Sequence, residues 1–177
     1  LQTMYEAFCK NSGKIAAANA QDILAAKGNG MSDAMIDRLT FDVRRVEKTA
    51  NAILDIIALP DPVGRVTGGS THPNGMSIEK VTAPLGVIGV IFESRPNVTI
   101  DAAALCLKAG NAVILRGGSE AIQSNVAIVQ VMRGALEQAG LPADCIQLVE
   151  DTTRESALQM MRLNQYIDVL IPRGGAG

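Results

Sequence analysis

The sequence predicts an α/β fold in which a doubly wound parallel sheet follows a helical N-terminal segment and a hairpin. Two observations support this fold class. The short apolar runs at 87–92 and 112–115 are typical of strands buried on both faces, and the Ala-rich segment 99–109 between them is typical of a helix. A strand–helix–strand unit of this length is almost always right-handed with parallel strands. The alternation of strand and helix then continues to the end of the chain.

Composition limits the partners that this chain can have. The 177 residues are 47% hydrophobic, which is enough for a proper core, and the net charge is −2. A slightly acidic chain with 3% aromatic residues gives no electrostatic or stacking reason to bind nucleic acid, and no apolar run is long enough to cross a membrane. Three dispersed cysteines and a single histidine argue against a metal site and favour a reducing, cytoplasmic compartment.

The first sixty residues are expected to form helices that pack on the sheet. Asn19 is expected to begin a short helix that ends at Gly28, and Ser32 a second helix. Thr40 is expected to begin a third helix, which ends before Pro60 and has apolar residues at the spacing of one helical face. These apolar residues are Val43, Val46, Ala50, Ile53, Leu54 and Ile57.

Residues 61–84 are expected to form a hairpin that links the helices to the sheet. The segment 61–64 has the composition of a turn, and the Gly- and Asn-containing segment 68–75 that of a loop tip. The flanking segments 65–67 and 76–82 are therefore predicted to pair as antiparallel strands.

Residues 85–177 are expected to form the α/β domain. After the first two strands, the pattern predicts a helix over 124–139, a third strand over 146–149, and a helix that begins with a capping box at Thr152 and Glu155. The fourth strand is predicted at 167–171. A fourth strand without a following helix would leave one face of the sheet partly bare, so we expect this domain to be incomplete and the chain to be part of a longer protein.

Polar residues follow the first strand at the edge of the sheet where ligands bind. In doubly wound sheets this edge lies outside the carboxyl ends of the strands. Glu93, Ser94 and Arg95 come directly after the strand at 87–92. Arg95 is suited to a carboxylate or a phosphate. Asn97 is either the N-cap of the following helix or a catalytic amide, and the residues alone leave both roles open.

Two Gly-rich loops follow other strands at the same edge. Arg116, Gly117, Gly118 and Ser119 follow the second strand, and Arg173 to Gly177 follow the fourth. Glycine lets the backbone approach a ligand closely, and arginine offers a fork of donors to phosphate. Each loop could also be an ordinary turn, but two such loops at one edge favour a phosphate site. The chain contains no Ser/His/Asp set and no Cys/His pair that would supply a nucleophile with its base.

Nearly the whole chain resembles one known family. The matching segments are DPVG at 61–64, PLGVIGVIFESRPN at 84–97, GNAVILRGG at 110–118, YID at 166–168 and IPRGGAG at 171–177. They resemble the γ-glutamyl phosphate reductases (glutamate-5-semialdehyde dehydrogenases), which are members of the aldehyde dehydrogenase superfamily. The ending of the chain resembles the bacterial type. The resemblance implies a Rossmann-type cofactor domain in 85–177 and a domain with the catalytic cysteine outside this chain.

The resemblance also implies a reaction, a cofactor and a substrate. In this family NADPH reduces L-glutamyl 5-phosphate to L-glutamate 5-semialdehyde and phosphate in proline biosynthesis, through a thioester on a cysteine. The motif of that cysteine does not match Cys9, Cys106 or Cys145. We therefore expect this chain to be inactive alone. Family members assemble through a protruding hairpin, which makes a homo-oligomer of the full-length form an expectation.

The resemblance assigns roles to single residues. Arg116 stands where aldehyde dehydrogenases place a lysine against the adenosine ribose, and Ser119 falls near the acidic residue that binds the ribose 2′-hydroxyl in NAD-dependent members, which leaves room for the 2′-phosphate of NADP. Gly174 and Gly175 match the loop under the pyrophosphate. Asn97 is the candidate oxyanion donor, although aldehyde dehydrogenases place that asparagine in a Pro-Trp-Asn context. The remaining cofactor and substrate candidates are Gly117, Gly118, Glu93, Ser94 and Arg95.

Two other functions stay open. One is another acyl-reducing aldehyde dehydrogenase, for example one that acts on a CoA thioester. The other is a nucleotide-binding module without catalytic activity. The Glu-Ser-Arg-Pro-Asn sequence at 93–97 favours the acyl phosphate over the CoA thioester.

Overall fold

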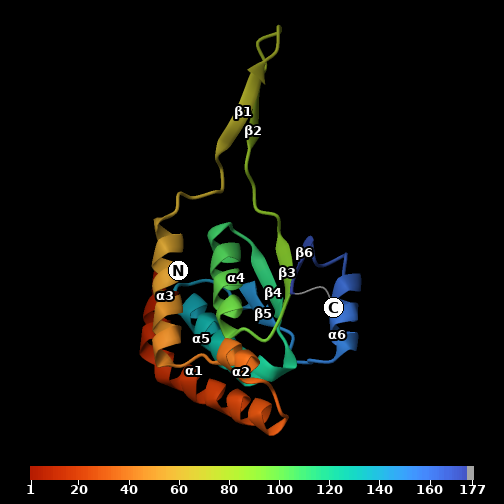
Figure 1. The fold of residues 1–177 in the computed structure, drawn as a ribbon. Coiled ribbons are helices and arrows are strands. Elements are labelled where there is room, and N and C mark those ends of the chain that lie inside the picture. The colour runs from red at the N-terminus through yellow and green to blue at the C-terminus, as the bar shows by residue number, and fades with distance from the viewer. Residues whose placement is uncertain (175–177) are drawn as a thin grey trace.

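Four parallel strands form the sheet predicted for the second half of the chain. The computed structural model describes residues 1–174. Within them the strands are β3 (Val87–Phe92), β4 (Ala112–Arg116), β5 (Ile146–Leu148) and β6 (Val169–Arg173). Their order across the sheet is β5-β4-β3-β6, and every neighbouring pair is parallel (Figure 1). The predicted doubly wound parallel sheet is therefore confirmed.

Helices lie on both faces of this sheet. α4 (Pro96–Lys108) and α5 (Ile122–Gln138) lie on one face, and α6 (Arg154–Arg162) lies on the other (Figure 1). The first two crossovers run from β3 to β4 to β5, and the third returns past both to β6. The strand order therefore reverses between β3 and β6. The crevice outside the carboxyl ends of the strands at such a reversal is where open α/β sheets bind ligands.

The core of the sheet lies on the face toward α4 and α5. Because side chains alternate along a strand, every second residue of β3 and β4 is buried on this face. These residues are Ile88, Val90, Phe92, Val113 and Leu115. On the opposite face Gly89 lets α6 approach, since a Cβ at Gly89 would lie 2.8 Å from Cε of Met160.

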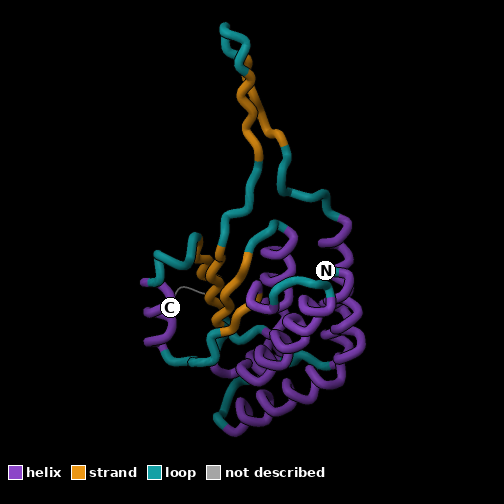
Figure 2. Tube along the Cα trace, turned by 180° about the vertical axis from the view of Figure 1, so that it is seen from behind, coloured by secondary structure: helices purple, strands orange, loops and turns teal. Residues whose placement is uncertain are grey.

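The N-terminal helices form a further layer over α4 and α5. They are α1 (Gln2–Gly28), α2 (Asp33–Leu39) and α3 (Val43–Ala58). α1 packs against α5 and α3, and α3 packs against α4 (Figure 2). Apolar side chains of α1 and α3 join those of the sheet in one hydrophobic core, whereas Ile36 and Leu39 of α2 form a second, smaller cluster with Ala26 and Ala121. None of the helices in residues 1–174 is both long enough and apolar enough to span a lipid bilayer.

A buried polar cluster fastens α1 to α5. We define the α1–α5 junction as Asn19, Asp22 and Ser124, all of which are buried. The prediction that Asn19 begins a helix is wrong, because α1 is continuous from residue 2 and Asn19 lies inside it. Its side chain instead donates to the carbonyl oxygen of Leu39 at 2.9 Å and to Ser124 Oγ at 3.0 Å, and it accepts from the amide of Phe41 at 2.6 Å.

Two other predictions for the N-terminal helices are also wrong. Asp42, not Thr40, caps α3, since its side chain accepts from the amide of Arg45 at 2.8 Å. The Thr40 hydroxyl donates to the carbonyl oxygen of Ile36 at the end of α2. The predicted apolar face of α3 is wider than the buried one. Val46, Ala50 and Ile53 are buried, Ile57 is partly buried, and Val43 and Leu54 are exposed.

The predicted hairpin stands away from the rest of the protein (Figure 2). β1 (Val66–Thr71) and β2 (Ser77–Val81) pair antiparallel, and all of their residues are exposed. β1 is longer than the predicted segment 65–67 and β2 is shorter than the predicted segment 76–82, and the tip is confined to residues 72–76. Gly75 has a φ of +87°, which only glycine adopts without strain, and it closes the turn.

Several element boundaries differ from the predictions. α4 begins at Pro96 with Arg95 as its N-cap, so Asn97 lies in the first turn and the prediction that it caps the helix is wrong. A short 3₁₀ helix (Ser119–Ala121) precedes α5, and another (Ala143–Cys145) precedes β5. The cap of α6 is Thr153 rather than Thr152. The Thr153 hydroxyl accepts from the amide of Ser156 at 3.2 Å, so no glutamate completes a capping box.

Candidate functional site

A cleft of about 930 Å³ opens at the carboxyl ends of β3, β4 and β6. Its floor is made by the ends of the strands and the loops that follow them. One wall comes from the end of α1 and from α2, through Met31, Met35, Arg38 and Leu39, and Met161 of α6 lies at the other side. The cleft is therefore at the edge that the sequence predicts, and the N-terminal helices help to enclose it.

The loops after β3 and β4 are joined by a hydrogen bond across the cleft floor. Ser94 Oγ donates to Glu120 Oε2. This bond is the main reason that the pKa of Glu120 lies below its usual range, so Glu120 is a carboxylate at neutral pH. Gly118 makes the contact possible, because a Cβ there would overlap Ser94 Oγ. The close approach of the two loops therefore requires glycine at position 118, whether or not a ligand binds there.

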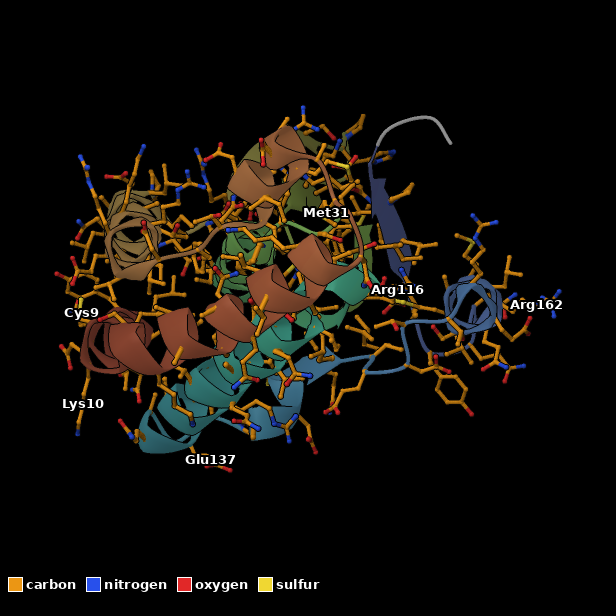
Figure 3. The ribbon with its side chains drawn as sticks, turned by 60° about the horizontal axis from the view of Figure 1, so that its bottom comes forward. Cys9, Lys10, Met31, Arg116, Glu137 and Arg162 are labelled. Atoms are coloured by element: carbon orange, nitrogen blue, oxygen red, sulfur yellow. The ribbon has the colours of Figure 1, made fainter. Side chains whose placement is uncertain are left out.

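Arg116 connects the end of β4 to the start of α6. Its Nη2 donates to the carbonyl oxygens of Thr152 at 2.6 Å and Thr153 at 2.9 Å. Its Nε is buried and has no hydrogen-bond partner among residues 1–174. Figure 3 shows Met31 and Arg116 on the same side of the molecule, with Arg162 on the far side of α6. Two backbone carbonyl oxygens thus hold the guanidinium in the cleft, and its buried Nε donor stays without a hydrogen-bond partner among residues 1–174.

Gly117 has a structural role. It is buried, and a Cβ there would overlap the side-chain amide of Asn125 and lie 3.1 Å from the ring of Phe92. Neither Gly117 nor Ser119 lines the cleft. Gly174 lines it, whereas Gly175 falls outside the described residues.

Asn97 is held by its own helix. Its amide Nδ2 donates to Asp101 Oδ2 at 3.1 Å. Burial raises the pKa of Asp101, and the hydrogen bond from Asn97 and the nearby charge of Arg173 oppose this rise. Asn97 does not line the cleft in the part of the chain that is described. The structure therefore places it beside the candidate site and not at its surface.

The structure brings together six of the predicted site residues and adds others. Those that line the cleft together are Glu93, Ser94, Arg95, Arg116, Gly118 and Gly174. Arg173 belongs to the second Gly-rich loop that the sequence predicts for a phosphate site, whereas the sequence assigned no role to Glu120 or to the wall formed by α1 and α2. Glu120 could have been found, since it directly follows the predicted loop. The wall could not, because Met31 and Arg38 reach the cleft only through tertiary packing.

The lining of the cleft is suited to an anionic ligand. Four arginines line it, at 38, 95, 116 and 173, against the carboxylates of Glu93 and Glu120. Arginine binds phosphate and carboxylate with two parallel donors, and methionine side chains adapt to flat apolar groups. No cysteine lines this cleft among the described residues, and burial raises the pKa of the Cys106 thiol. The arrangement can bind and orient a charged ligand but provides no thiolate nucleophile.

The model of the aldehyde dehydrogenase family matches residues 9–172 of this chain. The chain belongs to the aldehyde dehydrogenase family. The predicted family and fold are confirmed by this match.

Several relatives carry the same more specific description. The chain is 55% identical over all 177 residues to a gamma-glutamyl phosphate reductase of Heliobacterium modesticaldum, and it spans 42% of that protein. It resembles the crystal structure of gamma-glutamyl phosphate reductase from Thermotoga maritima, with a TM-score of 0.96, 39% identity, 99% of this chain covered and 42% of the other. The enzyme from Saccharomyces cerevisiae gives a TM-score of 0.89 and 34% identity, with 98% and 44% covered. The chain thus spans less than half the length of these relatives.

Proposed function

We propose that this chain is the cofactor-binding part of an enzyme that reduces L-glutamyl 5-phosphate to L-glutamate 5-semialdehyde and phosphate with NADPH, in proline biosynthesis. The observation that carries the proposal is the 55% identity over the full chain to a relative that bears this description. The catalytic cysteine, which forms the thioester, would lie outside these 177 residues. The segments 1–60, 61–84 and 85–177 would then be the N-terminal helices, the hairpin and the incomplete NADP-binding domain.

The residues of the cleft fit a phosphorylated dinucleotide. NADPH would supply the hydride when bound. Arg116 Nε is a buried donor without a hydrogen-bond partner in the described residues. A ligand atom that accepts a hydrogen bond from it would remove the free-energy cost of leaving this donor unsatisfied. Arg38 and Arg116 would provide positive charge for the phosphates, and Gly118 and Gly174 allow backbone approach. Ser119 does not line the cleft. Selection of NADP over NAD would therefore depend on binding of the 2′-phosphate by the arginines.

The polar residues after β3 would meet the substrate. Glu93, Ser94 and Arg95 lie on the β3 side of the cleft floor, opposite the loop that carries Arg116. We propose that Arg95 and Ser94 orient the acyl phosphate, and that Asn97 donates to its carbonyl oxygen if its second amide hydrogen turns toward the cleft. A homo-oligomer would form through the exposed hairpin. The free thiols of Cys9, Cys106 and Cys145 support a cytoplasmic location.

The test uses the complete polypeptide that carries this chain, in the oxidative direction. Glutamate 5-semialdehyde is mixed with NADP⁺ and either inorganic phosphate or CoA, and NADPH is followed by absorbance. We expect reduction of NADP⁺ that depends on phosphate and not on CoA. Dependence on CoA would point instead to an acyl-CoA reductase. Binding of NADPH without turnover in either mixture would support a nucleotide-binding module.

A further inference from the structure

Two arginines line the same small cavity where the strand order of the sheet reverses. Arg95 follows β3 and Arg173 ends β6, which pairs directly with β3. Both line a second, smaller cavity of about 300 Å³ next to the main cleft, together with Glu93, Val98 and Gly174. This volume is at the lower end of the range of about 300–1,000 Å³ for small-ligand sites. It is suited to a terminal group of a ligand rather than to a dinucleotide.

The guanidinium of Arg95 retains a donor for a ligand. Arg95 is the N-cap of α4, so its backbone is fixed between a strand and a helix. Its Nε is buried and has no hydrogen-bond partner among residues 1–174. Oε2 of Glu93 lies 3.5 Å from it, as an ion pair that is too long to be a good hydrogen bond. The side chain is 40% exposed, so the rest of the guanidinium can reach a ligand.

Arg173 is the second arginine that lines the small cavity. It lies opposite Phe92 in the register of β3 and β6, so its side chain is on the face of the sheet that carries α4. Within residues 1–174 its guanidinium takes part in no hydrogen bond, nor in an ion pair closer than 4.0 Å. Its charge acts on Asp101 of α4, which burial shifts toward the neutral form. Arg173 therefore has an exposed fork of donors that the described fold does not use.

The charges around the cavity favour a dianion. The charged residues that line it are Arg95, Arg173 and Glu93, and Asp101 is close enough to Arg173 for their charges to interact. Among the residues that line the cavity, two guanidiniums are present with a single carboxylate, so the lining carries a net positive charge. Two guanidiniums can each offer two parallel donors to a phosphoryl group, which is the geometry that arginine provides and lysine does not.

We propose that Arg95 and Arg173 together hold the phosphoryl group of the acyl phosphate. This inference rests on the proposed function and adds Arg173 as a residue that determines substrate specificity. It divides the crevice into a main cleft for the dinucleotide and a small cavity for the phosphate that leaves. In the oxidative direction the same cavity binds inorganic phosphate. The aldehyde carbon then loses a hydride to NADP⁺ and gains a C–O bond to phosphate, with release of one proton.

The test measures the KM for inorganic phosphate in the oxidative direction with the complete polypeptide. Arg173→Gln and Arg95→Gln each remove a charged donor pair, and we expect each to raise this KM at least about tenfold. The KM for NADP⁺ should change less than about twofold. Arg173→Lys keeps the charge but loses the fork, so its KM should lie between those of the wild type and the glutamine variant. Arg162→Gln is the matched control, since Arg162 is exposed on α6 and lines neither cavity.

Three outcomes separate the possibilities. An unchanged KM for phosphate in folded Arg173→Gln, as judged by circular dichroism, overturns the inference. A higher KM for NADP⁺ with an unchanged KM for phosphate also overturns it, and it would assign Arg173 to the pyrophosphate of the cofactor. A wild-type enzyme that shows no phosphate-dependent turnover contradicts the proposed function itself. If Arg173→Gln does not fold, Arg95→Gln and Arg173→Lys provide the same comparison.

Discussion

Two polar clusters of this protein differ in how completely they are hydrogen-bonded. In the α1–α5 junction every side-chain oxygen and nitrogen of Asn19, Asp22 and Ser124 has a partner. At the strand ends, Arg95 and Arg116 each bury an Nε that has no hydrogen-bond partner in residues 1–174. Both clusters lie at contacts between secondary-structure elements. Their position in the fold therefore does not explain why one is fully hydrogen-bonded and the other is not.

The difference separates structural polar groups from binding groups. Buried polar groups in native proteins are almost always paired, because an unpaired donor costs about 1–3 kcal/mol. A fully paired cluster thus stabilises the fold alone. An unpaired donor in the lining of a cleft costs free energy unless a water molecule or a ligand accepts a hydrogen bond from it. The α1–α5 junction should therefore respond to mutation as a stability element, and the strand-end arginines should respond as a binding site.

The largest effect on stability is expected at Asp22. Its carboxylate accepts from the amide of Gln123 at 3.1 Å, and from the amide and hydroxyl of Ser124 at 2.8 and 2.5 Å, at the first turn of α5. Asp22→Ala leaves these donors buried and unpaired. We expect the free energy of unfolding to fall by about 2 kcal/mol, measured by urea denaturation followed by circular dichroism.

Asp55→Ala is the matched control for this experiment. Asp55 is exposed on α3, and no hydrogen bond to its side chain exists among the described residues. Its removal should change the free energy of unfolding by less than about 0.5 kcal/mol. Equal losses in the two variants would mean that the α1–α5 junction does not stabilise the fold through its hydrogen bonds.

A smaller and mixed effect is expected at Arg116, which belongs to both kinds of site. Its Nη2 bonds to Thr152 and Thr153 are structural, whereas its Nε is available to a ligand. Arg116→Ala should therefore lower the free energy of unfolding by about 1 kcal/mol and also weaken NADPH binding by about tenfold. Fluorescence titration with NADPH and urea denaturation measure the two effects on the complete polypeptide.

Arg116→Lys distinguishes the two roles. Lysine keeps the positive charge near the cofactor but cannot bond two carbonyl oxygens through a planar fork. NADPH affinity should recover partly in this variant, whereas stability should recover little. If stability and affinity change together in both variants, the affinity loss follows from disorder of the start of α6, and Arg116 is then a structural residue only.

The sequence was sufficient for the sheet and insufficient for the helix starts. Apolar runs such as 87–92 predict strands well, since burial on both faces requires residues of this kind. The start of α1 was missed because Asn19 is a common N-cap and nothing local shows that it is paired by Leu39 and Ser124 instead. Local propensity cannot show that a polar side chain is satisfied by a residue more than a hundred positions away.

The candidate site was predicted in part for the same reason. The Glu93–Arg95 and Arg116–Gly118 segments follow strands, so the rule for ligand position in α/β sheets locates them directly. The structural requirement for glycine at Gly117 could not be predicted, because the close approach of Asn125 exists only in the folded chain. The pairing of Arg95 with Arg173 depends on β6 lying next to β3, which is fixed by the strand order and not by any local motif.

The smallest effect concerns the pH dependence of stability at Asp22. Burial raises the pKa of Asp22 above its usual range, against the hydrogen bonds from Ser124 and Gln123, which lower it. The folded chain therefore binds a proton at Asp22 at pH values where the unfolded chain, with a pKa of about 3.9, has lost it. The stability that protonation of Asp22 contributes to the fold is therefore fully present below the pKa of the unfolded state, and it is lost as pH rises through the pKa of the folded state.

The variant Asp22→Asn removes this titration. We therefore expect the free energy of unfolding of the wild type to fall, relative to that of Asp22→Asn, as pH rises from 4 to 7. Urea denaturation of both proteins across this range measures the difference. A difference that moves the other way would mean that the hydrogen bonds of the α1–α5 junction outweigh the desolvation of its carboxylate.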